Sequence, residues 1–506
     1  MRFPSLLAFL KDRRGNVAML YALTLPVLMF GAGFAIDYTH AQQVQTKLDA
    51  AADAAVLAAL TPTMMEQPNA TAQTAATNVF NAEASTIGSV VTGKTVLTIT
   101  VTNPGNSALN RTVTVAYTAA NTNIFAGVLG YSALGIAGTS TASASLAPNI
   151  DFYLLLDNSP SMALPATTSG LNLIVSLTSP AQGSDTSYTG CAFACHQVST
   201  GNGDTAGNPY WNPNNTSQTC TGAQSGSTNV GCVQMDDYQL AKSNGILLRI
   251  DELNTGVTTL MSTASSTTSA SPQSPPPAYR FAANSIDATY STGFTSLMSL
   301  TSNYVSGWST ASPNFQLMKM WTNNNGCSPG SSAAVPGTTA NDALYCTGGT
   351  ATNDQETNLD GVMTSANTLM PLPGGGTNTA GDTPQEVLFI VTDGVADEQN
   401  GSCNGTTSGG GRCYEPINTT LCSTIKARGI RIAILNTTYL AATNDNWYNS
   451  YIEPINVNPV SNSSIRNQLE ACASTNLYAE AGVGDDLSAA LTNLFNTVTN
   501  TAHLTN

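Results

Sequence analysis

The chain has 506 residues, 9% of them charged and 42% hydrophobic, which is long enough for two or more structural units and too apolar for charge-driven disorder. It carries 16 basic and 31 acidic residues, a formal net charge of −15. Basic residues are densest in residues 1–16, and the acidic remainder excludes nucleic acid as a partner because nothing there would neutralise phosphates. The three histidines, His40, His196 and His503, are too scattered for a histidine-built metal site or a catalytic triad.

The first predicted element is a membrane-spanning helix, Val17 to Ile36, a stretch of 20 residues without a charge. Such a helix is about 30 Å long, the thickness of the hydrocarbon layer. Basic residues precede it and Asp37 follows it, so the positive-inside rule places residues 1–16 in the cytoplasm and the rest outside. The alternative is a cleaved signal peptide. It is disfavoured because the span is long and no A-x-A cleavage site directly follows it.

After the span, residues 41–60 are alanine-rich and free of glycine and proline, which predicts that the helix continues outward as far as Thr61-Pro62. Two alternating segments, residues 97–101 and 113–117, then predict a hairpin, and residues 142–146 predict a third strand. A long helix, half in the membrane, followed by a small antiparallel sheet is the plan of a pilin-like stalk.

Residues 13–60 resemble the N-terminal segment of the Tad/Flp pilus-assembly TadE/TadG-like proteins, and the resemblance continues more loosely to residue 148. Processed pilins carry a glutamate five residues after the cleavage glycine, whereas this chain has Leu20 at that distance from Gly15. The resemblance therefore implies an anchor that is retained, as in TadG-like members.

The remaining residues, 149–506, contain three nearly continuous apolar runs, Ile150–Leu156, Val387–Val391 and Ile430–Leu435, which are typical of parallel strands buried on both faces. Four helical segments separate or follow them: Tyr238–Met261, Leu359–Met370, Thr420–Arg428 and Asp485–Val498. Alternating strands and helices predict a doubly wound, mostly parallel sheet, on which ligands bind beyond the carboxyl ends of the strands.

Two polar motifs follow predicted strands, a D-x-S-x-S sequence over residues 157–161 and Thr-Asp-Gly over residues 392–394. A D-x-S-x-S sequence alone is more often a polar turn. Its place after a buried strand, with a second acidic turn after another strand, favours a site for Mg²⁺ or Mn²⁺, which prefer hard oxygen ligands. The candidate ligands from these motifs are Asp157, Ser159, Ser161 and Asp393.

This pair of motifs resembles the metal-ion-dependent adhesion site of von Willebrand factor A domains, over residues 149 to about 500. The resemblance implies that the two serines face the metal directly or through water, together with a threonine from a third loop. The two aspartates would supply negative charge, and an open coordination position would accept an acidic residue of a protein ligand.

Two threonines are candidates for the third loop. Thr357 is followed by a predicted helix and lies 36 residues before Asp393, whereas Thr377 lies only 16 residues before it. Because the family's fold needs a whole helix in that interval, Thr357 is the choice and Thr377 the alternative.

The ten cysteines all lie beyond residue 190, and their even number fits an oxidising compartment outside the cytoplasm. The first eight, taken in order, form four pairs of near neighbours that could staple loops, although the sequence leaves the pairing open. The candidate disulfide cysteines are Cys191, Cys195, Cys220, Cys232, Cys327, Cys346, Cys403, Cys413, Cys422 and Cys472. Six of them lie in two predicted insertions, at about 163–234 and 306–356.

These features together predict a cytoplasmic segment (1–16), a transmembrane helix (17–36), a pilin-like helix and antiparallel sheet (37–148), and a von Willebrand factor A-like domain (149–506). The resemblances imply a single-pass protein of the bacterial inner membrane, with its main domain periplasmic or surface-exposed. Its expected role is Tad/Flp pilus assembly or anchoring and surface adhesion, with pilin or other envelope assembly proteins as partners.

Two other interpretations stay open. One is a pilus-independent adhesin or receptor that uses the same metal site. The other is a periplasmic redox or haem protein built on residues 191–196, Cys-Ala-Phe-Ala-Cys-His, although haem attachment normally has two residues between the cysteines. No G-x-S-x-G sequence is present, and we expect no enzyme activity.

Overall fold

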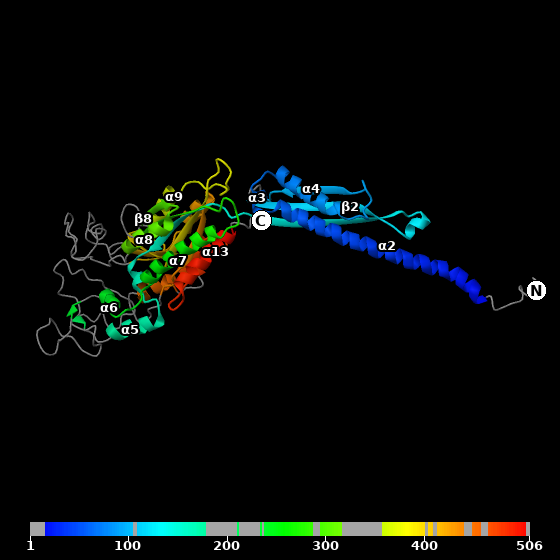
Figure 1. Ribbon diagram of the computed structural model, residues 1–506. Coiled ribbons are helices and arrows are strands. Elements are labelled where there is room, and N and C mark those ends of the chain that lie inside the picture. Colours follow the sequence, from blue (N-terminus) through cyan, green and yellow to red (C-terminus); the bar gives the residue numbers. More distant parts are fainter. Residues whose placement is uncertain are drawn as a thin grey trace, which may run out of the picture. The chain divides into compact units, whose positions relative to one another are not determined.

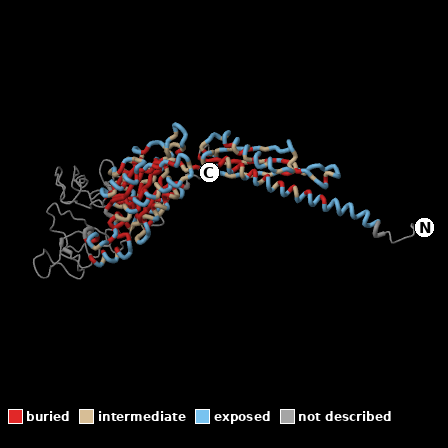
Figure 2. Tube along the Cα trace, in the orientation of Figure 1, coloured by how far each residue is buried: buried red, intermediate tan, exposed pale blue. Residues whose placement is uncertain are grey.

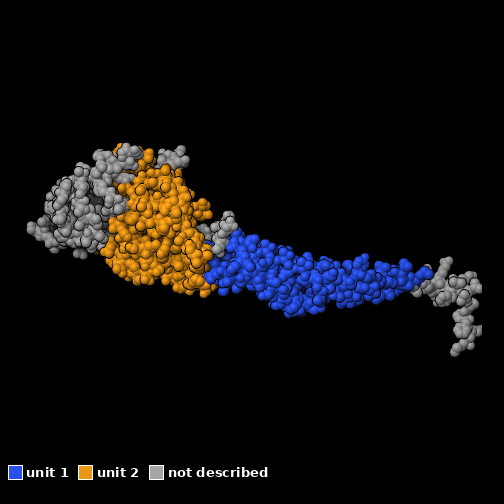
Figure 3. Space-filling model, turned by 90° about the horizontal axis from the view of Figure 1, so that it is seen from above, with its two compact units in different colours: residues 1–146, 505–506 blue, residues 147–504 orange. Residues whose placement is uncertain are grey.

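The computed structural model describes residues 16–104, 109–178, 210–211, 233–234, 237–286, 294–315, 357–399, 403–407, 412–439, 448–456 and 464–501. The chain divides into two compact units whose boundary lies between Leu146 and Ala147, two residues before the place chosen from the sequence (Figure 3). Each unit has its own sheet and its own hydrophobic core, so each is described by itself.

The first unit begins with a single long helix, α2 (Asn16–Ala59), as the sequence predicted (Figure 1). Residues 19–36 are exposed except for Gly33, and the side chains there are almost all apolar. From Asp37 onward every third or fourth residue is buried, which is the pattern of a helix that packs through one stripe (Figure 2). Helix α2 therefore has an apolar half without protein neighbours on most sides and an amphipathic half that packs on the rest of the unit.

The other elements of the first unit cover the amphipathic half of α2. Strands β1 and β2 form the expected hairpin, and β3 adds to β2, all antiparallel in the order β1-β2-β3. Inward-facing Val113, Val115 and Tyr117 alternate with less buried residues along β2. The Tyr117 hydroxyl donates to Asp49 of α2 at 2.6 Å, which joins sheet and helix. The bounds are α3 Pro62–Met65, α4 Asn69–Ser85, β1 Val96–Thr102, β2 Asn110–Thr122, η3 Ala126–Leu129 and β3 Ala133–Ser145.

The second unit is built on a six-stranded sheet in the order β14-β13-β9-β4-β7-β8. All neighbouring strands are parallel except β7 and β8. Numbered along the chain and read from the β8 edge, the order is 3-2-1-4-5-6, one of the orders of doubly wound sheets. The apolar runs predicted such a sheet but not the order of its strands. The strands are β4 Ile150–Asp157, β7 Tyr279–Ile286, β8 Phe294–Thr301, β9 Gln385–Thr392, β13 Arg431–Asn436 and β14 Tyr478–Glu480.

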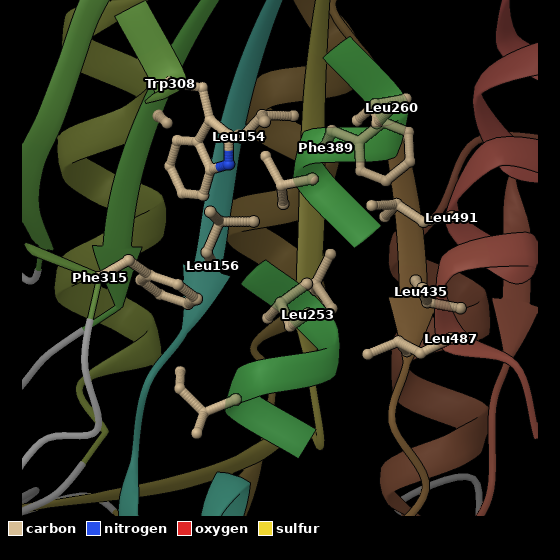
Figure 4. Packing of buried hydrophobic residues seen from close by; sticks show 14 of the residues in the cluster. Leu154, Leu156, Leu253, Leu260, Trp308, Phe315, Phe389, Leu435, Leu487 and Leu491 are labelled. Atoms are coloured by element: carbon tan, nitrogen blue, oxygen red, sulfur yellow. The ribbon is translucent and has the colours of Figure 1, made fainter. Parts of the chain in front are cut away.

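Helices cover both faces of this sheet, which explains why β4 and β9 are apolar without alternation. Phe152, Leu154 and Leu156 of β4 face the core under α7, α8 and α13, whereas Tyr153 and Leu155 face the core under α9, α10 and α12 (Figures 1 and 4). The helices are α5 Thr168–Thr178, α6 Asp237–Ser243, α7 Arg249–Ser269, α8 Tyr304–Ala311, α9 Leu359–Leu369, α10 Thr419–Ala427, α11 Glu453–Asn456, α12 Ile465–Cys472 and α13 Leu487–Thr501.

Short elements complete the second unit. Strands β10, β12 and β11 form a small antiparallel sheet in that order, and β5 pairs with β6. Their bounds are β5 Tyr210–Trp211, β6 Val233–Gln234, β10 Val395–Gln399, β11 Thr406–Thr407 and β12 Arg412–Pro416. The single turns are η4 Pro160–Ala163, η6 Ser312–Asn314 and the π-helical η9 Tyr448–Ile452.

One predicted helix is wrong in its extent. The segment 238–261 is not continuous but forms α6 and α7, with a break in which Gly245 adopts a φ of +67°. In that break Leu247 is 45% exposed, whereas Leu248 is fully buried. The left-handed backbone at Gly245 turns the chain between the two helices, a conformation that favours glycine.

Parts of the two predicted insertions belong to the core. Ile174 of α5 and Trp308 of α8 are buried in the same cluster as β4, although both lie within the ranges 163–234 and 306–356. Most of the remaining residues of both ranges, with their six cysteines, lie outside the described residues. Among the described residues there are two disulfides: Cys403–Cys413, one of the near-neighbour pairs, and Cys422–Cys472, which joins α10 to α12.

Candidate metal site at the carboxyl edge of the sheet

The two polar motifs meet at one place in the second unit. Asp157 is the last residue of β4, and Asp393 directly follows β9. These strands are neighbours, with Leu156 opposite Val391, so both motifs leave the same carboxyl edge of the sheet. From β4 the chain continues to β7 and β8 on one side, and from β9 to β13 and β14 on the other. The motifs therefore lie where the strand order reverses, the usual position of a ligand on a doubly wound sheet.

The acidic and hydroxyl side chains of the two motifs lie close together. Ser159 lowers the pKa of Asp157, and Ser161 lowers the pKa of Asp393, so each serine side chain lies beside one carboxyl group. The two serine Oγ atoms lie 2.8 Å apart and close the gap between the aspartates. The four candidate ligands from the two motifs thus form a continuous group, which we call the edge cluster: Asp157, Ser159, Ser161 and Asp393.

Neighbouring groups fix the first aspartate in place. Its Oδ1 accepts the Ser159 backbone N–H at 2.9 Å, and its Oδ2 accepts the Thr392 hydroxyl at 2.6 Å. The Gly394 N–H in turn donates to the Thr392 hydroxyl at 3.0 Å, so the turn after β9 supports the hydroxyl that holds Asp157. Only Ser161 of the edge cluster is partly exposed, and the cluster reaches solvent there.

The two carboxyl groups of the edge cluster disfavour each other's charge. Burial and the nearby charge of Asp157 raise the pKa of Asp393 to about 7. Burial also raises the pKa of Asp157, against hydrogen bonds from Thr392 and Ser159 that lower it. Two buried carboxylates with adjacent hydroxyls are hard oxygen donors that a divalent cation would neutralise.

One buried cation, Arg249 at the start of α7, also acts on this edge. It is 4% exposed, and its charge lowers the pKa of Asp393, although less than burial and Asp157 raise it. Its Nη1 donates to the carbonyl oxygens of Thr437 and Thr438, at 2.6 and 2.9 Å, after β13. Its hydrogen bonds thus serve the adjacent loop, and it balances the edge cluster only through space.

Thr357, the preferred threonine, lies at the start of the segment that leads into α9. Its backbone N–H and C=O pair with Asp397 of β10, four residues after Asp393, and its side chain is buried. Asn358 then caps α9, with its side chain accepting the Gly361 N–H at 2.6 Å. The structure therefore connects Thr357, through its backbone, to the strand that follows Asp393.

Thr377, the alternative threonine, lies at the opposite edge of the sheet. Its hydroxyl and its N–H both donate to Asp382, at 2.6 and 2.8 Å. The preceding Gly376 accepts the N–H of Asn149, the residue before β4. The eight residues of β4 separate this loop from Asp157, about 26 Å of extended chain.

Other predicted features do not form a site in the described part of the chain. Residues 191–196, the haem-like segment, lie outside the described residues. Cys403, Cys413 and Glu415 gather potential ligand atoms, but the cysteines form a disulfide and Glu415 accepts the Asn404 N–H at 2.8 Å. Sequence reasoning missed Thr392 and Arg249. The first stands in the Thr-Asp-Gly motif and could have been included, whereas nothing in the sequence marks the second.

Comparison with known proteins identifies one region. The family described as putative Flp pilus-assembly TadE/G-like matches residues 15–76, the region of α2 and the start of α4. Helix α2 includes a segment long and apolar enough to cross a membrane, and almost none of its most apolar part is buried within the protein. The first unit thus contains a Tad pilus-assembly-like segment with a helix that could span a membrane. A comparison with curated proteins finds no match.

Two solved structures are similar to the chain at a low level. The pilus adhesin SpaC from Lactobacillus rhamnosus GG has a TM-score of 0.31 and 11% identity, covering 81% of this chain and 34% of that one. A mutant of the PilB minor pilin from Streptococcus sanguinis has a TM-score of 0.30 and 10% identity, covering 82% and 79%. The chain spans about a third of the SpaC chain. Similarities this low carry no argument about the second unit.

Proposed function

We propose that this protein is a single-pass envelope protein of a Tad/Flp pilus system, with the first unit as a pilin-like stalk on the outer side of the inner membrane. The match at residues 15–76 and the exposed apolar half of α2 support this role. Residues 1–16 would lie in the cytoplasm, because their basic residues precede the span and Asp37 follows it. The two disulfides fit an oxidising compartment for the second unit.

The second unit, in this proposal, is a von Willebrand factor A-type binding domain rather than an enzyme. The observation that carries it is the edge cluster, four oxygen-bearing side chains gathered at the reversal point of a 3-2-1-4-5-6 sheet. Asp157, Ser159, Ser161 and Asp393 would hold Mg²⁺ or Mn²⁺, and Thr357 is the candidate from the third loop. Bound there, the ion would supply a positive site for a carboxylate of a protein partner, such as pilin or another assembly protein.

Metal binding can be tested on the full-length chain in detergent micelles by titration with Mn²⁺ and electron paramagnetic resonance. We expect about one tightly bound Mn²⁺ per chain, displaced by excess Mg²⁺, and loss of that binding in Asp157→Asn and Asp393→Asn. Thr377→Val is the matched control, because its hydroxyl serves Asp382 at the opposite edge, and it should bind like the wild type. Wild-type protein that binds no Mn²⁺, or a loss in Thr377→Val alone, would contradict the proposed site.

The pilus role is tested separately in the native host by replacing the gene with the Asp157→Asn variant. Loss of surface pili, with normal amounts of the variant in the membrane, would support partner binding through the edge cluster. Normal pili with defective adhesion would favour the pilus-independent adhesin. Normal pili and normal adhesion in a strain without the gene would refute the proposed role.

A further inference from the structure

The loop between β2 and β3, residues 123–132, differs from an ordinary surface loop. Its sequence, Asn-Ile-Phe-Ala-Gly-Val-Leu-Gly-Tyr-Ser, contains no charged residue and forms the single turn η3. Five large apolar or aromatic side chains of the loop are substantially exposed: Ile124 (64%), Phe125 (43%), Val128 (80%), Leu129 (54%) and Tyr131 (71%). Soluble surfaces seldom gather exposed apolar groups in this way, and such patches mark contacts with a partner or a membrane.

Buried Asp37 of α2 holds this loop in place. Its Oδ1 accepts the N–H of Ile124 at 2.8 Å, and its Oδ2 accepts those of Phe125 and Ala126 at 2.9 and 2.6 Å. Three N–H groups at the start of η3 thus converge on one carboxylate, which is 3% exposed. Charge-assisted hydrogen bonds of this kind are stronger than neutral ones, so the loop has a defined position along α2.

A close contact one helical turn earlier fixes the same position. A side chain added at Gly33 would lie 2.7 Å from the Phe125 Cβ, so the loop packs directly on the backbone of α2 there. Gly33 and Asp37 are one turn apart and therefore on the same face of the helix. The loop lies beside the end of the apolar half of α2, as Figure 1 shows in cyan against the blue helix.

This position puts the exposed apolar side chains level with the last turn of the segment 17–36. If that segment crosses the bilayer, the loop lies in the interfacial layer, where lipid headgroups meet the acyl chains. Leucine and valine gain free energy by entering the acyl region, and tyrosine is enriched at this depth in membrane proteins. The absence of charged residues in the loop removes the main cost of entering it.

We propose that residues 124–131 insert into the lipid interface next to α2 and form a second membrane contact of the stalk. This inference rests on the membrane anchoring in the proposed function and adds a lipid-binding surface to it. The occupant of the exposed apolar side chains is thus the outer leaflet of the membrane that α2 crosses. A helix with one attachment can tilt freely, whereas a helix and a loop in the same interface restrict the tilt of the first unit.

The experiment uses the full-length chain in phosphatidylcholine–phosphatidylglycerol vesicles, with a small environment-sensitive fluorescent amino acid at one of three positions. Val128 tests the loop, and Leu28, in the middle of the span, reports whether α2 is in the bilayer. Ser143, exposed on β3, is the control, because it lies ten residues beyond Ala133, about 33 Å along the strand. Lipids that carry a nitroxide quencher are then added, near the headgroup in one sample to reach Val128 and deep in the acyl chain in a second sample to reach Leu28.

We expect a blue shift and quenching at Val128, quenching at Leu28, and neither effect at Ser143. Quenching at Leu28 without any at Val128 would overturn the loop insertion and leave the anchor intact. No quenching at Leu28 would instead refute the membrane anchor itself. A blue shift at Val128 without quenching would mean that protein, from a second copy or a partner, covers the loop, and would also overturn the lipid assignment.

A variant tests whether Asp37 sets the position of the loop. Asp37→Ala removes the acceptor of three backbone N–H groups, and we expect it to reduce quenching at Val128 while quenching at Leu28 is unchanged. Asp53→Ala is the matched control and should leave quenching at Val128 unchanged. Asp53 also lies on α2, but it accepts a hydrogen bond from the Ser140 hydroxyl of β3 at 2.5 Å, so it joins the helix to the sheet and not to the loop. Unchanged quenching at Val128 in Asp37→Ala would contradict the positioning role of Asp37.

Discussion

Strands β4 and β9 carry a pair of acidic residues at each end, and the two pairs differ in what surrounds them. At the amino edge, Asp151 lies opposite Glu386 in the sheet and opposite Arg280 of β7. Arg280 forms a two-pronged ion pair with Asp151, with Nε 2.7 Å from Oδ1 and Nη2 against Oδ2. Burial and the charge of Asp151 raise the pKa of Glu386 to about 8, so a proton neutralises it near pH 7.

At the carboxyl edge, the pair Asp157 and Asp393 is surrounded by hydroxyl groups instead. Thr392, Ser159 and Ser161 donate to or bridge the carboxylates, and Arg249 forms its hydrogen bonds with carbonyl oxygens. The guanidinium of Arg280 thus pairs with Asp151 at the amino edge, whereas ordered hydroxyl groups adjoin the two aspartates at the carboxyl edge, both of which have a raised pKa. An acidic pair alone does not indicate a metal site, because the neighbouring groups decide whether a cation is needed.

The largest expected effect is at the amino edge, in Arg280→Met. This variant leaves Asp151, which is 1% exposed, charged and without its ion pair. We expect a loss of about 3 kcal/mol of unfolding free energy. This value is at the lower end of the range for breaking a buried ion pair, because Arg280 is partly exposed. Urea unfolding of the full-length protein, followed by tryptophan fluorescence, measures it, since all four tryptophans lie in the second unit. Lys242→Met, which removes an exposed ion pair with Asp251, should change stability by less than about 1 kcal/mol.

The next effect is metal stabilisation at the carboxyl edge. Mg²⁺ at about 100 times its dissociation constant should raise the unfolding free energy by roughly 2.7 kcal/mol. Asp157→Asn should abolish this gain, because it removes a charged ligand from the edge cluster, whereas Glu386→Gln should keep it. Equal Mg²⁺ stabilisation in all three proteins would mean that the ion binds elsewhere, and would remove the functional difference between the two edges.

Thr392→Val tests the hydroxyl that orients Asp157. The change removes a buried hydrogen bond to a carboxylate, which should cost about 2 kcal/mol without metal and weaken Mn²⁺ binding as well. The matched control is Thr424→Val on α10, whose exposed hydroxyl bonds the Thr420 carbonyl within its own helix, at 3.0 Å. A control within about 0.5 kcal/mol of the wild type, with a clear loss in Thr392→Val, would show that the effect belongs to the site.

The smallest effect is a pH dependence at the amino edge. The pKa of Glu386 is raised to about 8 in the folded protein, so its stabilising contribution is complete below about pH 4.5 and is lost as the pH rises through 8. Glu386→Gln does not titrate, so its stability relative to the wild type should rise between pH 5 and pH 8.5. We expect a rise of at least about 1.4 kcal/mol, the equivalent of one pKa unit.

Unfolding in urea at the two pH values measures this difference. Glu470→Gln, on the exposed side of α12, is the control and should keep the pH dependence of the wild type. A parallel pH dependence in Glu386→Gln and the wild type would show that Glu386 is already ionised, and that no proton neutralises the acidic pair at the amino edge.

The local sequence was enough to predict those helices and strands whose residues are nearly all apolar. The uncharged stretch before Asp37 predicts the exposed half of α2, and the nearly continuous apolar runs predict β4, β9 and β13, because a strand buried on both faces is mostly apolar. The two polar motifs were recognised because each follows such a run. Since parallel strands end at the same edge, the sequence alone placed Asp157 and Asp393 together.

Only the tertiary structure decided features that depend on distant neighbours. Strand β7 contains Arg280, Asn284 and Ser285 and was not predicted, yet its pairing with β4 and β8 buries all but Arg280. The placement of Thr377 at the opposite edge and the tie of residues 124–126 to Asp37 likewise join segments far apart in the chain. Local patterns record whether a residue meets water or an apolar interior, but which residue it meets is set when the strands and helices pack.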